Sequence, residues 1–260
     1  MSKSACHFIL FRDIPLMYGR VPKVANSSIK ASLCRLLSLR PDGGIKTTSD
    51  RFWRDNTHGE TQLITPLQAR RLRKTHFSFS FVRNPFDRLV AAYNNKILEI
   101  EDVPLPMKRM GLSHGMSFAS FIQTVCDADP LMMDNHVRPQ SEMLTISNKL
   151  VPKFVGRMEH INGHWRQLRR RMRLEQLPTL GTLPLKNVRR DGRSDIRELF
   201  NSLKLIDQVL EFYQQDFEWF YGSYSVDSLL NGDGLKKLPP LQIGRKGLGK
   251  HSPQKLKQIV

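Results

Sequence analysis

The fold is decided by residues 14–28, IPLMYGRVPKVANSS, where an apolar run gives way to a polar loop. The apolar run over residues 14–20 predicts a short strand. After the loop, Asn26 or Ser27 can cap a helix, since short polar side chains favour that position. The residues that follow repeat at helical spacing on one face: Ile29, Leu33, Leu36 and Leu37. The order is therefore strand, loop, helix.

The same order recurs in residues 77–93, FSFSFVRNPFDRLVAAY. A strand is predicted over residues 77–82, Asn84 suits the helix N-cap and Pro85 suits the first helical turn. A third apolar run over residues 153–156 precedes an arginine-rich segment. Three such units predict an α/β fold with a central parallel sheet and crossover helices.

The rest of the chain fits one domain with a tail. We predict a single domain over residues 1–231 and a basic Gly/Lys/Pro-containing tail over 232–260, since periodicity stops there. Between the second and third units, a helix begins near Ser117 and leads to a segment ending at His136, where we expect acceptor contacts. Residues 196–220 predict one or two further helices.

The composition indicates a globular protein that attracts anions. Among 260 residues, 41 Lys and Arg against 24 Asp and Glu leave a formal charge of +17. This excess predicts a positive potential toward anionic ligands or polymers. The three cysteines, Cys6, Cys34 and Cys126, cannot all pair within the chain and form no C-x-x-C motif, so we expect reduced thiols. No segment has the roughly 20 apolar residues of a membrane span.

Both strand-to-helix junctions have features of anion sites. A loop before a helix offers backbone N–H groups and the positive end of the helix dipole, and Lys23 adds a charge there. Arg83 adds a guanidinium at the second junction. Together they predict a ligand with two separated phosphates. The first loop lacks the G-x-x-x-x-G-K-[ST] spacing, so an ordinary ATP or GTP site is not supported. The alternative is a capped helix start with an exposed lysine.

A family resemblance rests on these motifs. Residues 20–30, RVPKVANSSIK, resemble the 5'-phosphosulfate loop of sulfotransferases that use 3'-phosphoadenosine 5'-phosphosulfate (PAPS), in particular the Golgi carbohydrate sulfotransferases, sulfotransferase family 2. Residues 81–93 look like the 3'-phosphate motif of the same branch. Weaker likenesses lie at 154–159, 183–187 and 213–221, so the resemblance covers about residues 14–224.

The resemblance implies a P-loop-type sheet flanked by helices, PAPS as donor, 3',5'-ADP as product and no metal. Lys23 would neutralise the leaving group as charge develops on it. The family places a serine where this chain has Ala91, and Ala25-Asn26 also departs from its commoner small pairs. The residues that would bind the nucleotide are Pro22, Lys23, Val24, Ala25, Asn26, Ser27, Ser28, Arg83, Ala91 and Asn187.

A general base must accept the proton of the acceptor hydroxyl. His136 is the first candidate, because residues 135–140, NHVRPQ, resemble the acceptor-side segment of the family. The alternative to a catalytic role is a histidine that packs or hydrogen-bonds structurally. His58 with Glu60 is a second candidate pair. The basic run of residues 166–173 is either a solvated helix face or a patch for an acidic polymer.

The function expected from the sequence is in-line sulfuryl transfer from PAPS to a hydroxyl, with an acidic glycan as acceptor. A non-enzymatic polyanion or nucleic-acid binder is one alternative. No nucleic-acid recognition motif is apparent, so we expect no nucleic-acid partner. A P-loop kinase is the other, disfavoured by the loop spacing. The expected location is the cytoplasm, or the Golgi if the chain is a soluble fragment of a membrane-anchored enzyme.

Overall fold

The computed structural model describes residues 5–41, 43–184, 195–237 and 239–242. The chain forms two compact units. Of the described residues, the first unit comprises 5–41, 43–82, 142–184, 237 and 239–242, and the second comprises 83–141 and 195–236. The single domain over residues 1–231 stays a prediction.

The first unit is built on a six-stranded sheet in the order β3-β1-β2-β4-β7-β8. The central strands β2, β4 and β7 are parallel, which confirms the predicted α/β fold with a parallel central sheet. β1 pairs antiparallel with β2 and β3, and β8 pairs antiparallel with β7. The strands are β1 (Phe8–Phe11), β2 (Leu16–Gly19), β3 (Thr61–Ile64), β4 (Phe77–Val82), β7 (Phe154–Arg157) and β8 (Leu241–Gln242).

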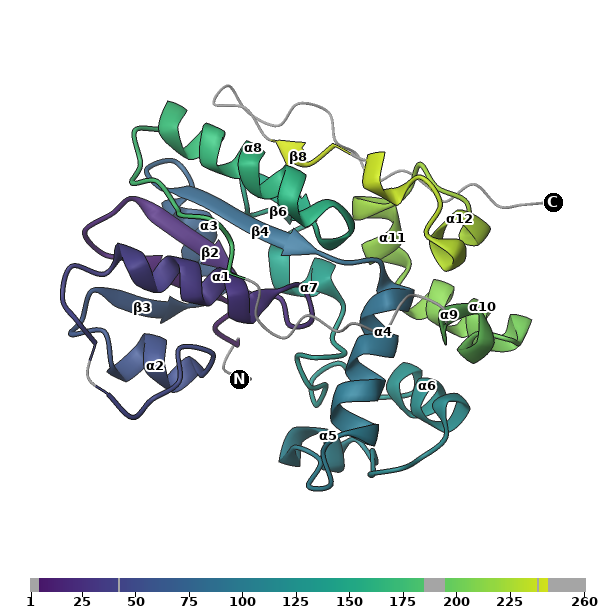
Figure 1. The fold of residues 1–260 in the computed structure, drawn as a ribbon. Helices are drawn as coiled ribbons and strands as arrows, with labels where there is room; N and C mark the ends of the chain where they lie inside the picture. Colours follow the sequence, from purple (N-terminus) through teal and green to yellow (C-terminus); the bar gives the residue numbers. More distant parts are fainter. Residues whose placement is uncertain (1–4, 42, 185–194, 238, 243–260) are drawn as a thin grey trace. The chain divides into compact units, whose positions relative to one another are not determined.

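Helices cover the sheet of the first unit. Figure 1 shows α1 and α8 over the face turned to the viewer and α3 behind the sheet. All six residues of β4 are buried, as expected of a strand enclosed on both faces. The remaining elements are α1 (Asn26–Leu33), η1 (Cys34–Leu36), α2 (Asp50–Asp55), α3 (Pro66–Leu72), β5 (Thr145–Ile146), β6 (Lys149–Leu150), η3 (Met158–His160) and α8 (Ile161–Leu174). α7 (Gln140–Leu144) and η4 (Leu235–Lys237) span the boundaries between units.

The register of β2 and β4 decides where their following loops begin. Gly19 pairs in parallel with Ser80, and the Ser80 hydroxyl donates to the Gly19 carbonyl oxygen at 2.7 Å. Both strands therefore end at the same edge of the sheet. In α/β sheets, ligands bind outside this carboxyl edge.

The second unit is helical and has an aromatic core. The ring of Phe86 lies 4.9 Å from that of Phe200 and 5.3 Å from that of Phe217, and Phe118 also packs against Phe200 at 4.9 Å. Its helices are α4 (Pro85–Tyr93), the π-helix η2 (Asn94–Leu98), α5 (Leu105–Arg109), α6 (Phe118–Cys126), α9 (Asp195–Leu199), α10 (Leu203–Phe212), α11 (Gln214–Phe220) and α12 (Val226–Asn231). Residues 195–220 thus form three helices where one or two were predicted.

The predicted tail is partly described. It contains η4 and the strand β8, whose Leu241 pairs with Val155 of β7. Residues 243–260 lie outside the described residues.

Candidate functional site

The loop between β2 and α1 has an uncommon backbone conformation. Lys23 has φ 69° and Ala25 has φ 58°, both in the left-handed region. That region costs a residue with a Cβ atom about 1–2 kcal/mol. Turns of this kind point successive backbone N–H groups to one side and form anion-binding concavities.

The start of α1 carries no side-chain cap. Its N-cap residue is Ala25, so the prediction that Asn26 or Ser27 caps this helix is wrong. The Asn26 side chain instead accepts a hydrogen bond from the Tyr18 hydroxyl at 3.0 Å. Burial raises the pKa of Tyr18, so its hydroxyl keeps the proton that it donates. The N–H groups at the start of a helix commonly bind water or an anion.

Two lysines near this loop have different environments. Lys23 is half-buried in the loop, whereas Lys30 is buried inside the unit. The Lys30 Nζ lies 2.9 Å from the Thr48 carbonyl oxygen and 3.0 Å from Asp50 Oδ1. Burial alone would raise the pKa of Asp50, but the charges of Arg20 and Lys30 lower it. Lys30 is therefore structural, and the ligand-binding role predicted for Lys23 stays a prediction.

The other predicted residues of this loop follow the turn into α1. Val24 is fully buried and anchors the loop. Pro22 and Ser27 are half-buried, and Ser28 is buried in the first turn. The structure thus brings Pro22 to Ser28 together at the carboxyl edge of β2.

Arg83 lies in the second junction, directly after β4. Its backbone N–H donates to Gln140 Oε1 at 2.9 Å, and its carbonyl oxygen accepts from Gln140 Nε2 at 2.8 Å. Its side chain is 27% exposed, and its Nη2 lies 3.9 Å from Asp87 Oδ1. Asn84 caps α4 by accepting from the Phe86 N–H, and Pro85 begins the helix, which confirms both predictions.

Of two other predicted nucleotide ligands, Ala91 and Asn187, the structure describes only the first. Ala91 is half-buried on α4, eight residues after Arg83. Asn187 lies outside the described residues, so its proposed role stays a prediction.

His136 forms a dyad with a carboxylate that the sequence analysis missed. The His136 Nδ1 lies 2.7 Å from Asp134 Oδ1, which also accepts the backbone N–H of His136 at 2.8 Å. Burial would raise the pKa of Asp134, but hydrogen bonding to His136 and its charge lower it, so Asp134 is ionised at neutral pH. A carboxylate at Nδ1 fixes the ring and favours proton acceptance at Nε2. The D-x-H spacing was the available signal.

Arg88 holds the backbone around His136. Its side chain is almost fully buried, and its two terminal nitrogens donate to the carbonyl oxygens of Arg138 at 2.8 Å and Asn135 at 2.9 Å. These carbonyls flank His136 in the chain. The Tyr213 hydroxyl donates to the Val137 carbonyl oxygen in the same segment.

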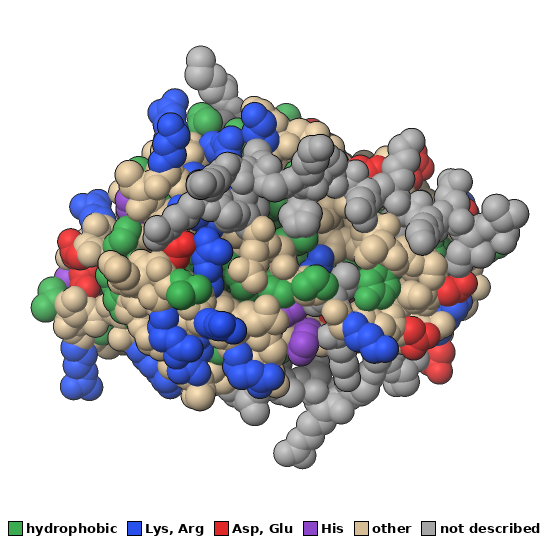
Figure 2. Space-filling view, turned by 90° about the horizontal axis from the view of Figure 1, so that it is seen from above, with side chains coloured by type: hydrophobic (Ala, Val, Ile, Leu, Met, Phe, Trp, Pro, Cys, Tyr) green, Lys and Arg blue, Asp and Glu red, His purple; other side chains and the backbone are tan. Residues whose placement is uncertain are grey.

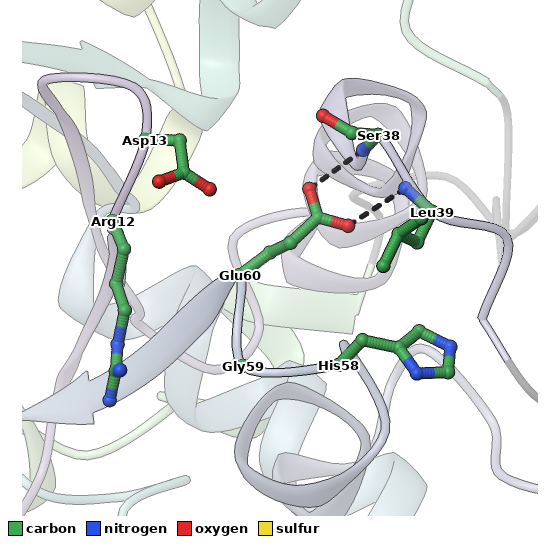
Figure 3. A pocket seen from close by; sticks show the side chains of 7 residues that line it. All are labelled: Arg12, Asp13, Ser38, Leu39, His58, Gly59 and Glu60. Atoms are coloured by element: carbon green, nitrogen blue, oxygen red, sulfur yellow. Dashed lines mark hydrogen bonds between the residues drawn. The ribbon is translucent and has the colours of Figure 1, made fainter.

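His58 and Glu60 line a separate cavity of about 420 Å³ in the first unit (Figure 3). The Glu60 carboxylate accepts the N–H groups of Ser38 at 2.7 Å and Leu39 at 2.8 Å, and the His58 ring extends away from it. Burial would raise the pKa of Glu60, but these hydrogen bonds lower it, which makes Glu60 a poor base.

The sheet register separates this cavity from the loop after β2. β1 pairs through Phe8 with Gly19 at the carboxyl edge of β2, and through Phe11 with Thr61, next to Glu60. The three steps from Phe8 to Phe11 along β1 cover about 10 Å. This placement gives no support to His58 and Glu60 as the base.

The basic run lies on α8. Arg166, Arg170 and Arg173 are exposed, whereas Arg171 pairs with Glu175 at 2.8 Å. A partly paired, exposed row of arginines fits the solvated helix face that was one of the two interpretations.

Within the described ranges, no group of three or more His, Cys, Asp or Glu side chains could hold a metal ion. No helix in this part of the chain is both long and apolar enough to cross a membrane. Cys6, Cys34 and Cys126 form no disulfide.

Comparison with known proteins gives the class. The model of the sulfotransferase family matches residues 6–223, so the chain belongs to that family. Carbohydrate sulfotransferase 14 of Danio rerio is 28% identical over 152 residues, which cover 51% of this chain and 39% of that protein. The Mus musculus and Homo sapiens proteins of the same name are each 26% identical over 148 residues, 51% of this chain and 38% of theirs. No solved structure matches significantly.

These matches confirm the resemblance to carbohydrate sulfotransferases. The aligned part spans about two fifths of the length of those relatives.

Proposed function

We propose that this chain transfers a sulfuryl group from PAPS to a hydroxyl of a carbohydrate. The observation that carries the proposal is the loop after β2. Two non-glycine residues, Lys23 and Ala25, are left-handed there, and the helix that follows has no side-chain cap. Backbone strain of this kind persists where function requires it, and an uncapped helix start favours a negatively charged group.

The nucleotide roles follow the two junctions. When bound, PAPS supplies a sulfuryl group attached to a good leaving group, 3',5'-ADP. The N–H groups from Lys23 to Ser28 bind the 5'-phosphosulfate, and the Lys23 ammonium stabilises charge that develops on the leaving oxygen. Arg83 binds the 3'-phosphate through its guanidinium.

His136 is the proposed general base. Its Nε2 accepts the proton of the acceptor hydroxyl, while Asp134 holds Nδ1 and stabilises the protonated ring. A positioned base of this kind contributes about 10²- to 10⁴-fold to rate. The acceptor oxygen thus loses its proton to His136 and gains the sulfuryl group, while 3',5'-ADP leaves. The product is a sulfate ester.

The acceptor is proposed to be an acidic glycan. The relatives are named as carbohydrate sulfotransferases, and the net charge of +17 favours an anionic partner. Figure 2 shows Lys and Arg side chains spread over the face seen from above. The location, in the cytoplasm or as a soluble part of a Golgi enzyme, stays a prediction.

The test combines nucleotide binding with turnover. We expect 3',5'-ADP to bind in calorimetry more tightly than ATP, and labelled sulfate to pass from PAPS to a member of a glycan panel. Lys23→Ala abolishes transfer and keeps the melting temperature, whereas Lys74→Ala, at an exposed lysine of the same unit, keeps transfer. A protein that binds neither 3',5'-ADP nor PAPS contradicts the proposal.

A further inference from the structure

The side chain of Gln140 forms two hydrogen bonds with the backbone of Arg83. Its Oε1 accepts the Arg83 N–H at 2.9 Å and its Nε2 donates to the Arg83 carbonyl oxygen at 2.8 Å. This is the two-bond pattern of residues paired across antiparallel strands, made here by one amide side chain. The bonds join residues 57 positions apart in the sequence.

Asp216 fixes the orientation of that amide. Its carboxylate is fully buried, and Oδ2 accepts the Gln140 backbone N–H at 2.8 Å and Gln140 Nε2 at 3.1 Å. Oδ1 accepts the Ser141 N–H at 2.6 Å. Asp216 Oδ2 is an acceptor in these contacts, so the donor Nε2 of the amide points to it and the acceptor Oε1 faces the Arg83 N–H. The amide cannot be flipped without losing these bonds.

Arg83 occupies the position where such support matters. Arg83 follows Val82, the last residue of β4, and precedes Asn84, the N-cap of α4. Among the hydrogen bonds described here, those that fix its peptide come from Gln140 and not from the sheet or the helix. The direction of the side chain follows from the orientation of that peptide. A bidentate guanidinium contact depends on direction as well as distance.

We propose that Gln140 is a positioning residue for Arg83, oriented by Asp216, and that it acts on recognition of the nucleotide 3'-phosphate. The inference rests on the proposed function. Gln140 does not touch the nucleotide in this proposal, and its effect is confined to the phosphate that Arg83 binds. A merely structural role would instead weaken binding of all nucleotides alike.

The experiment measures the binding of 5'-AMP and 3',5'-ADP by calorimetry. The dissociation constant of 5'-AMP divided by that of 3',5'-ADP gives the contribution of the 3'-phosphate, and we call this quotient the ratio. Arg83→Met sets the baseline, with a ratio near one. In Gln140→Met, which keeps side-chain volume and removes both bonds to Arg83, we expect the ratio to fall about tenfold, while 5'-AMP affinity stays within about twofold.

Ser141→Ala is the matched control. Ser141 is buried beside Gln140 on α7, its hydroxyl makes no hydrogen bond, and its backbone N–H to Asp216 is kept in the variant. We expect its ratio to equal that of the wild type. If Gln140→Met fails to fold, Gln140→Glu keeps the acceptor for the Arg83 N–H, loses the donor to its carbonyl oxygen, and should lower the ratio as well.

The outcomes separate this inference from the proposed function. A wild-type protein that binds both nucleotides equally shows that the 3'-phosphate site itself is wrong. A wild-type protein that discriminates, together with glutamine variants that keep the ratio or weaken both nucleotides equally, overturns the positioning role alone.

Discussion

Replacing Asp134 by asparagine tests the proposed base, because it removes a charge and keeps the shape. One atom, Oδ1, receives both the His136 ring nitrogen at 2.7 Å and the His136 backbone N–H at 2.8 Å. The amide oxygen of asparagine can accept both bonds from the same place. Asp134→Asn therefore removes the negative charge beside the ring, whereas Asp134→Ala removes the geometry as well.

The magnitudes follow from the kind of hydrogen bond. Hydrogen bonds to a charged group contribute about 1.5–3 kcal/mol and neutral ones about 0.5–1.5 kcal/mol. The Asp134 side chain is 11% exposed, so solvent screens it little. The difference of about 1–1.5 kcal/mol predicts a turnover roughly tenfold lower for Asp134→Asn. Loss of the whole bond in Asp134→Ala predicts a decrease of about 10- to 150-fold.

The assay follows transfer of labelled sulfate from saturating PAPS over about pH 5.5 to 8.5. Because the carboxylate stabilises the protonated ring, its loss shifts the acid limb of the profile to lower pH. Binding of 3',5'-ADP should not change. Asp127→Asn, at an exposed carboxylate of the same unit, is the control. If Asp134→Asn has wild-type turnover at every pH, the dyad has no part in proton transfer.

Three further predictions concern other parts of the chain. Ala91→Ser restores the hydroxyl that the family places on α4, and we expect 3',5'-ADP but not 5'-AMP to bind about 2- to 10-fold more tightly in calorimetry; equal affinities contradict that role. Arg88→Lys replaces a guanidinium with two terminal donors by a single ammonium, which cannot reach both carbonyl oxygens beside His136. Turnover should fall at least about tenfold while the affinity for 3',5'-ADP is kept. Unaltered turnover would show that these two hydrogen bonds do not position His136. Asp50→Asn should destabilise the fold by about 1 kcal/mol at neutral pH, since the carboxylate is half exposed and offsets the Lys30 charge. Folding lowers the pKa of Asp50. The ionised carboxylate therefore adds to the free energy of unfolding at pH values above the unfolded-state pKa of about 3.9, and this stabilisation is lost as the pH falls through the folded-state pKa. Urea denaturation of both proteins should therefore converge in acid, and parallel curves at all pH values refute the charge effect.

The strands next to the candidate site could be predicted because their signals are local. β2, β4 and β7 are apolar runs that end in polar loops, and the sequence predicted all three. The antiparallel strands β1 and β3 were missed. Each has four residues, and the two strands pair with each other across 50 to 56 positions, from Phe11 with Thr61 to Phe8 with Ile64. Short strands of this kind depend on tertiary context.

The two helix caps show how a tertiary contact overrides a local preference. Asn84 caps α4 as predicted, since its side-chain oxygen reaches the Phe86 N–H. Asn26 has the same local preference, but the Tyr18 hydroxyl of β2 engages its side chain and the cap moves to Ala25. A sequence window cannot show that competition, because it depends on the register of a neighbouring strand.

The candidate site shows the same limit. The sequence pointed to Lys23, Arg83 and His136 as site residues, but it did not show that Gln140, Arg88 and Asp216 support them. Asp216 is 76 positions from Gln140, and its carboxylate became recognisable only when the fold brought the two together.

The start of α4 connects two of the proposed roles within the second unit. Gln140 holds the peptide of Arg83 just before the helix, and Arg88, on its first turns, holds the carbonyls on both sides of His136. The segment of residues 135–140 is thus bonded at both of its ends to the same short stretch of chain. If these contacts act separately, Gln140→Met changes the 3'-phosphate ratio and Arg88→Lys changes turnover, each without the other effect. If either variant changes both, the segment and the start of α4 move as one body, and the phosphate ligand and the base are energetically coupled.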